Sequence, residues 1–280
     1  MKWNVSSTGG GFSTVTISAM KPEDVVYAEE NTLFTSSGVF DEKGNPDGKL
    51  RRSLITPEEL AGASYTPQKR FTFWGQMAEE SRIDEAQTAA RKNSGERPYV
   101  VYRATAKNQS VTFKSHFPGS ILIWQVREMA ENFDTKVSYA APNPEDRPRG
   151  TLIAVKGAFL CGDLRARSTV FNTKQDDIRQ FSGTGDAFQR FAGKGVICLE
   201  AHGTLQEVRL KRNQTVTCWP GDLLAFTEGI TLRMISAGDS TLRNEENNDY
   251  LILAKAGEKG GFLYAKSVQV GEFFRKQGSH

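Results

Sequence analysis

The chain has 280 residues, with 36 basic and 33 acidic side chains and a formal net charge of +3. Hydrophobic residues make up 38% and charged residues 25% of the chain, which is the composition of an ordinary globular protein. So small a net charge gives no strong signal for nucleic acid or for an anionic membrane. The three cysteines, Cys161, Cys198 and Cys218, are odd in number and form no CxxC pair, which argues against a disulfide scaffold.

The N-terminal segment carries no recognisable targeting signal. Met1–Gly11 has neither an apolar h-region nor an arginine-rich amphipathic stretch, so it predicts no signal peptide and no clear transit peptide. The longest apolar runs, Gly119–Val126 and Tyr250–Ala256, are far shorter than the roughly 20 residues of a membrane-spanning helix. We therefore expect an intracellular protein without a transmembrane segment, either soluble or peripheral to a membrane.

In chain order, most of the sequence consists of short runs of β-branched and aromatic residues between Gly, Pro, Asn and Asp. Many short strands separated by turns predict an all-β protein, specifically a β-sandwich of short antiparallel strands. The runs that predict strands are Phe12–Ser18, Val25–Ala28, Tyr99–Ala104, Gln109–Phe113, Ser120–Val126, Thr151–Val155, Gly195–Glu200, Thr204–Leu210, Gln214–Cys218, Thr231–Ile235, Tyr250–Ala256 and Phe262–Val268.

Two segments interrupt this succession of strands. Phe40–Ser64 is rich in Gly, Pro and charged residues, which is typical of an extended surface excursion. Gln76–Asn93 is rich in helix formers and is followed by Gly95, so it predicts one surface helix. We therefore expect a single β-sandwich domain over residues 1–280, with an insertion at about residues 41–110 that contains this helix.

The sequence also contains a weak internal repeat. Lys21–Val39 aligns with Lys211–Ile230, and both segments have the pattern of a strand, a tight turn and a second strand. Phe188–Leu205 aligns in the same way with Leu251–Val268, through a strand, a glycine-rich turn and an alternating strand. Duplicated hairpin units that pack face to face are one way to build a sandwich.

No group of residues forms a recognisable catalytic or metal-binding motif. A zinc site needs three or four converging ligands, and His116, His202 and His280 have no partner at a suitable spacing. We expect the three cysteines to be core or near-core thiols, because free cysteine is among the most buried residue types. The sequence therefore predicts no catalytic residue, no metal ligand and no cofactor site, and it predicts that the protein is not an enzyme.

Two further features have structural interpretations. The glycines of Gly183–Gly185 and Gly193–Gly195 are of the type found in phosphate-binding loops, but these segments lead into strands and are interpreted as hairpin turns. Five basic residues could form a stripe that meets an anionic partner, although the similar number of acidic residues favours a mixed surface. The five are Arg165, Arg167, Arg209, Lys211 and Arg212.

Several motifs resemble one protein family. Within Asp186–Ile235, the turn Phe191-x-Gly193-x-Gly195 is followed by an apolar strand, and Trp219-Pro220-Gly221 leads to Leu224-Ala225-Phe226. This stretch resembles the altered inheritance of mitochondria protein 24 (AIM24) family. The resemblance implies a fold like that of the tryptophan RNA-binding attenuation protein, a tendency to self-associate, and no catalytic residue.

Three other segments extend the resemblance to about two-thirds of the chain. Met20–Phe34 resembles the first hairpin of the family, and Leu152–Leu160, with the small residues that follow it, resembles a central strand. Tyr250–Tyr264 resembles the closing strand pair. The resemblance lapses between roughly Asp41 and Ser110, which is where the insertion is expected.

The leading functional hypothesis is a non-enzymatic structural or scaffolding subunit. We expect it to form a homo-oligomer or to belong to a larger assembly, with protein partners contacted through the insertion at about residues 41–110. One alternative is a small-molecule or RNA-binding regulatory module, by analogy with the attenuation protein. Another is a component of a virion or of an appendage particle.

At the level of single residues, the sequence predicts structural positions. Four glycines are expected to hold turn conformations, and five apolar residues are expected in the core. The turn residues are Gly193, Gly195, Gly221 and Gly229, and the core residues are Phe159, Leu160, Leu199, Leu224 and Phe226.

Overall fold

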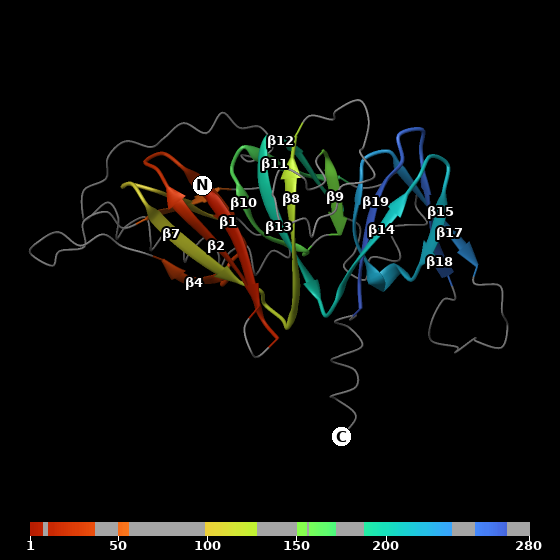
Figure 1. Cartoon of the computed structure of the whole chain (residues 1–280), viewed down its shortest axis with the longest axis horizontal. Coiled ribbons are helices and arrows are strands. Elements are labelled where there is room, and N and C mark those ends of the chain that lie inside the picture. The colour runs from red at the N-terminus through yellow and green to blue at the C-terminus, as the bar shows by residue number, and fades with distance from the viewer. Residues whose placement is uncertain are drawn as a thin grey trace, which may run out of the picture.

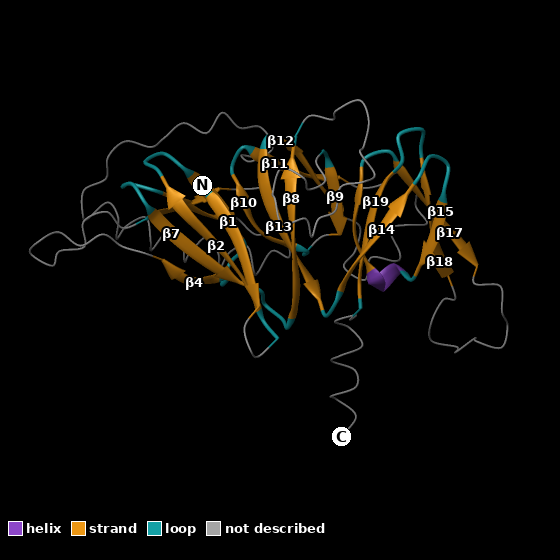
Figure 2. Ribbon diagram, in the orientation of Figure 1, coloured by secondary structure: helices purple, strands orange, loops and turns teal. Residues whose placement is uncertain are grey.

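The computed structural model describes residues 1–7, 11–36, 50–55, 99–127, 150–155, 157–171, 188–236 and 250–267. These residues form antiparallel strands, together with one short 3-10 helix, η2 (Pro220–Asp222), which Figure 2 shows in purple among the orange strands. The prediction of an all-β fold with short antiparallel strands is confirmed. The helix predicted over Gln76–Asn93 lies outside the described residues.

The strands fall into three consecutive repeats with one pairing pattern. In each repeat of six strands, the first and third strands pair with the sixth, and the second and fourth pair with the fifth. Repeat 1 consists of β2 (Ser13–Met20), β3 (Val25–Ala28), β4 (Leu33–Ser36), β5 (Arg51–Ile55), β6 (Tyr99–Arg103) and β7 (Gln109–Lys114). It is preceded by β1 (Lys2–Ser7), which pairs with β2.

The other two repeats follow directly along the chain. Repeat 2 consists of β8 (Gly119–Val126), β9 (Leu152–Val155), β10 (Phe159–Asp163), β11 (Ala166–Phe171), β12 (Phe188–Gly193) and β13 (Gly195–His202). Repeat 3 consists of β14 (Leu205–Leu210), β15 (Thr215–Cys218), β16 (Leu223–Thr227), β17 (Ile230–Ser236), β18 (Tyr250–Ala256) and β19 (Gly261–Lys266).

Neighbouring repeats share sheets, because the second strand of one repeat pairs with the third strand of the next. The pairs β3–β10 and β9–β16 create inner sheet 1, with the order β5-β6-β3-β10-β13-β8, and inner sheet 2, with the order β11-β12-β9-β16-β19-β14. The remaining strands form two smaller end sheets: the N-terminal end sheet β1-β2-β7-β4 and the C-terminal end sheet β15-β18-β17. Figure 1 shows the four sheets stacked along the long axis, with the end sheets at opposite ends.

Local geometry repeats along with the pairing. The pairing of each third strand with its sixth strand shifts register at the same place, between Leu33 and Thr35 in β4, between Phe159 and Cys161 in β10, and between Leu223 and Ala225 in β16. Because the shift occurs at the same place in each pair, Leu33, Phe159 and Leu223 occupy equivalent positions, and so do Thr35, Cys161 and Ala225.

The turn before the second strand is also shared by repeats 1 and 3. A side-chain oxygen of Asp24 accepts a hydrogen bond from the backbone N–H of Lys21, and a side-chain oxygen of Gln214 accepts one from that of Lys211. Over residues 21–36, the turn and the two strands expected from the alignment of Lys21–Val39 with Lys211–Ile230 occupy equivalent places in repeats 1 and 3; residues 37–39 lie outside the described residues. The second predicted alignment falls on the fifth and sixth strands of repeats 2 and 3, and the corresponding strands of repeat 1, β6 and β7, were not predicted as a third copy.

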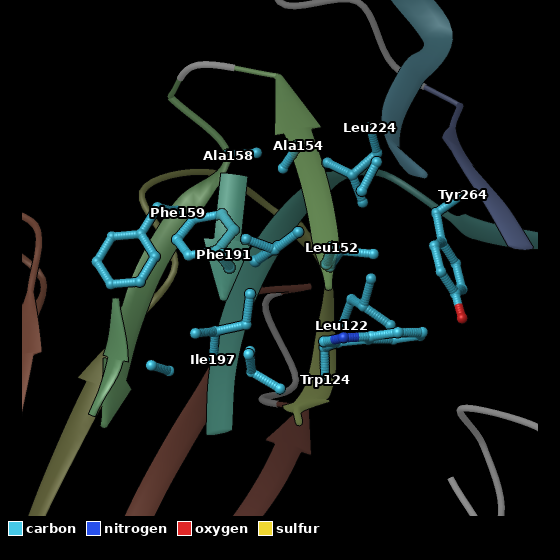
Figure 3. Packing of buried hydrophobic residues seen from close by; sticks show 14 of the residues in the cluster. Leu122, Trp124, Leu152, Ala154, Ala158, Phe159, Phe191, Ile197, Leu224 and Tyr264 are labelled. Atoms are coloured by element: carbon cyan, nitrogen blue, oxygen red, sulfur yellow. The ribbon is translucent and has the colours of Figure 1, made fainter. Parts of the chain in front are cut away.

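Three hydrophobic clusters fill the spaces between the four sheets. The central cluster lies between the inner sheets and contains Tyr27 and Phe159 stacked at 4.7 Å, and Phe159 and Phe191 stacked at 5.5 Å. Figure 3 shows Phe159 beside Phe191, and Trp124 directed toward the strand of Tyr264. The outer two clusters join each end sheet to its inner neighbour.

The segment predicted as a surface excursion, Phe40–Ser64, contains a strand. β5 lies at the edge of inner sheet 1, and its last residue, Ile55, is buried in the central cluster. The run is only five residues long and begins with two arginines, so its pattern is hard to distinguish from a charged loop. Repeat 1 is longer than the other repeats at two connections. Residues 37–50 separate its third and fourth strands, where repeats 2 and 3 have residues 164–165 and 228–229, and residues 56–98 separate its fourth and fifth strands, where they have residues 172–187 and 237–249.

Leu224 and Phe34 occupy equivalent positions in β16 and β4, yet Leu224 is fully buried whereas Phe34 is 57% exposed. We predict that Leu224→Ala lowers the free energy of unfolding by about 2–5 kcal/mol, because it leaves a cavity in the core. Phe34→Ala should lower it by less than about 1 kcal/mol in dilute solution. Urea unfolding followed by tryptophan fluorescence measures both, and equal costs would contradict this difference in burial.

Candidate functional site

A buried polar cluster lies where repeat 1 passes into repeat 2. Glu200, near the end of β13, is buried, and its carboxylate accepts hydrogen bonds from the backbone N–H of His116 at 2.8 Å and from the ring at Nδ1 at 2.9 Å. The other ring nitrogen of His116, Nε2, lies 3.2 Å from the backbone oxygen of Glu30. With an acceptor opposite each nitrogen, the ring is placed as a protonated imidazolium requires.

The position of Glu200 follows from the repeat. The backbone N–H of Glu200 donates to the backbone oxygen of Ala158, and the backbone N–H of Lys114 donates in the same way to the backbone oxygen of Thr32. Glu200 and Lys114 are therefore equivalent, and the registers of the third strands place Lys266 at the same position in repeat 3. The middle repeat thus carries an acid where the outer two carry a lysine. This acid holds His116, which lies in the short connection between β7 and β8.

A second histidine adjoins the cluster. His202 Nε2 is 3.9 Å from Glu200 Oε1, and the ring packs edge-on against Phe117 at 4.8 Å. Within the part of the chain that the structure describes, neither ring nitrogen of His202 has a hydrogen-bond partner. Burial lowers the pKa of His202, so this ring is neutral at pH 7.

The two histidines therefore differ in charge. The hydrogen bond with Glu200 raises the pKa of His116 to about 9, against the opposing effect of burial. A histidine that is already protonated at neutral pH donates hydrogen bonds and accepts none, so it is not a general base there. The hydrogen bonds between His116 and Glu200 hold the connection between repeats 1 and 2 against β13.

A second buried carboxylate has a similar structural role. Asp163, at the end of β10, accepts from the backbone N–H of Arg165 at 3.0 Å and forms a salt bridge with its guanidinium, with one contact at 2.6 Å. These bonds close the turn between β10 and β11. A Cβ added at Gly195 would lie 2.9 Å from Cβ of Asp163, so the β12–β13 turn approaches this acid closely.

The residues singled out from the sequence lie in the turns and in the core. Gly193 and Gly195 flank Lys194 between β12 and β13, Gly229 lies between β16 and β17 with a φ of 97°, and Gly221 lies in η2. The predicted core residues are all buried, and they are Phe159, Leu160, Leu199, Leu224 and Phe226.

The cysteines are free thiols in the structure. Cys161 and Cys198 face each other across the β10–β13 pair and are buried, and burial raises the pKa of the Cys161 thiol. Cys218, on β15, is partly buried, and burial raises its pKa to about 11, so it is protonated at neutral pH.

Three of the five basic residues proposed as a stripe have acidic partners. Arg165 pairs with Asp163, Arg209 with Glu207 and Arg212 with Glu258. This pairing gives the mixed surface that the sequence favours. The side chain of Arg167 is outside the described set.

No sequence motif singles out Glu200 and Asp163, although both hold connections between strands. The signal for Glu200 is an acid at the end of the apolar run Val196–Leu199, in a strand predicted to be buried. Over the described ranges, no group of three or more His, Cys, Asp or Glu side chains could hold a metal ion. Those same ranges contain no helix long and apolar enough to cross a membrane.

Large exposed hydrophobic residues occur at both ends of the stack. Phe34 lies on β4, at the edge of the N-terminal end sheet, and Trp219, 46% exposed, follows β15 at the edge of the C-terminal end sheet. The strands equivalent to β4, namely β10 and β16, are buried along their whole length. In the inner sheets a neighbouring strand covers the equivalent edge, whereas in the end sheets these two edges are exposed.

The His116–Glu200 pair predicts a dependence of stability on pH. The pKa of His116 is about 9 in the folded protein and near 6.5 when unfolded, so its contribution is complete below pH 6.5 and is lost as the pH rises toward about 9. We expect the free energy of unfolding of the natural protein to fall over this interval, and that of His116→Asn to fall less. Urea titrations across the interval measure both, and identical pH slopes would contradict the role of the pair.

Comparisons with known proteins give a family and a fold. Residues 6–247 match the family described as "Mitochondrial biogenesis AIM24". No curated protein matches the chain. Its fold is similar to the crystal structure of protein SPYM3_0169 from Streptococcus pyogenes, with a TM-score of 0.59, 12% sequence identity, and coverage of 99% of this chain and 98% of that one. Since the family match spans most of the sequence, the chain belongs to the AIM24 family.

Proposed function

We propose that the protein is a non-enzymatic structural subunit that associates with other polypeptides through the ends of its stack of sheets. One observation carries the proposal. Among the described residues, each end sheet contains only half of the strand pattern that the inner sheets have in full. Open strand edges are places where further chains can add.

The polar clusters support a structural role. Glu200 and Asp163 are the buried carboxylates with the most extensive hydrogen bonding described above, and both bind chain segments that join strands. The family description refers to mitochondrial biogenesis and names no reaction. We propose a soluble or peripheral protein that contacts the other polypeptides of its complex through the insertion predicted at about residues 41–110.

The proposal predicts that the protein isolated gently from its source is part of a particle heavier than one chain. Native mass spectrometry should show masses above 31.0 kDa, either multiples of it or masses that include other polypeptides. A single chain at every concentration would overturn the proposal, and so would turnover of a defined substrate. Binding of RNA that weakens steeply with salt would instead favour a regulatory module.

A further inference from the structure

We infer that the partner at these ends is a second copy of this chain, joined head to tail by antiparallel pairing of β15 of one copy with β4 of the next. The inference rests on the proposed function and gives it a partner and a register. Its basis is the joint that the chain already makes twice within itself, between the second strand of one repeat and the third strand of the next.

The two internal joints have the same register. In the first, Ala28 of β3 is opposite Cys161 of β10, and Tyr27 is opposite Gly162. In the second, Ala154 of β9 is opposite Ala225 of β16. Because the shared register shift aligns Cys161 with Ala225, the two joints match residue for residue.

The same alignment fixes the register of a third joint. Ala104 and Ala256 exchange equivalent backbone hydrogen bonds with the turns at Asp24 and Gln214, so β3 and β15 align with Ala28 at the position of Cys218. The register shift in β4 places Thr35 at the position of Cys161. Cys218 of one copy is therefore expected opposite Thr35 of the next.

Joining the two end sheets completes the pattern of an inner sheet. The order β17-β18-β15 followed by β4-β7-β2 corresponds strand for strand to β5-β6-β3 followed by β10-β13-β8, with β1 as one additional strand at the far edge. The strands that would complete the N-terminal end sheet of one copy are thus those of the C-terminal end sheet of another copy.

The exposed aromatic residues lie at this joint. In the first internal joint, the backbone N–H of Glu29 donates to the oxygen of Leu160 at 3.0 Å. The equivalent positions are Trp219 and Phe34, two of the three large hydrophobic residues that are exposed among those described. Pairing brings them together across copies and removes part of their apolar surface from water.

The chemistry of the two edges suits reversible association. β4 and β15 have four residues each, and β15 carries two exposed threonines, so a single copy tolerates both edges in water. The register shift in β4 does not prevent pairing, since β10 and β16 have the same shift and pair on that side. Because the edges lie at opposite ends of the stack (Figure 1), the contact is head to tail and can continue beyond a dimer.

The test is a cysteine placed opposite the natural Cys218. Directly opposed strand residues have the Cα separation that a disulfide requires. With a mild oxidant such as diamide, Thr35→Cys should give a ladder of dimers, trimers and larger species on a non-reducing gel, and reductant should collapse it. Thr35 is exposed, so the variant should keep the natural unfolding midpoint.

Three controls define the contact. Adding Cys218→Ser to Thr35→Cys should abolish the ladder, and so should Ser36→Cys in place of Thr35→Cys, because Ser36 is expected opposite Thr217. Oxidation of the natural protein should give no ladder either. A dimer in that control would indicate a symmetric β15–β15 contact and would overturn the inference.

A charge at the edge provides a second measurement. Phe34→Lys should shift the mass distribution of the full chain toward the single copy, whereas Phe12→Lys, which changes an exposed aromatic away from this edge, should leave it unchanged. If native masses show homo-oligomers or other polypeptides while Thr35→Cys gives no ladder, the inference fails and the proposed function stands. If only single chains occur, both fail.

Discussion

The pairing of one repeat's second strand with the next repeat's third strand is the constraint on which the rest of the structure depends. Each inner sheet is built half from one repeat and half from its neighbour, and its two faces line different hydrophobic clusters. A repeat taken alone would have two half-sheets and unpaired backbone groups at both edges. An intramolecular hydrogen bond adds only about 1 kcal/mol of net stability, because it replaces a hydrogen bond to water. A buried backbone group left unpaired costs more than this, so each joint matters mainly because it keeps buried groups paired.

This constraint also explains the placement of the buried acid in the middle repeat. Three similar repeats can in principle exchange partners, because their strands present similar backbones to one another. Glu200 breaks the similarity, since the outer repeats have Lys114 and Lys266 at its position and only Glu200 can accept from His116. In some proteins a buried charge of this kind selects one arrangement over its competitors, and we propose this role for Glu200.

Strands with strong hydrophobic patterns can be predicted from the sequence. The contacts that hold the strands and repeats together are predicted much less well. The ranges predicted for β3, β6, β7 and β18 differ from the observed bounds by at most one residue, because their runs of β-branched and aromatic residues end at clear turn signals. β5 was missed because it is short and begins with charged residues. The joints between repeats and the His116–Glu200 pair depend on strands far apart in the chain, and no local pattern specifies them.

The connection between the fourth and fifth strands has a consequence for how this architecture can change over evolution. Those two strands are adjacent antiparallel neighbours, and the fourth strand lies at the outer edge of its sheet in every repeat. Lengthening such a connection breaks no pair, and each doubling of a flexible loop costs only about 0.6 kcal/mol of closure entropy. The architecture can therefore acquire new segments at three corresponding sites while the pairing of its strands stays the same, and repeat 1, with residues 56–98 at this site, has accepted the longest.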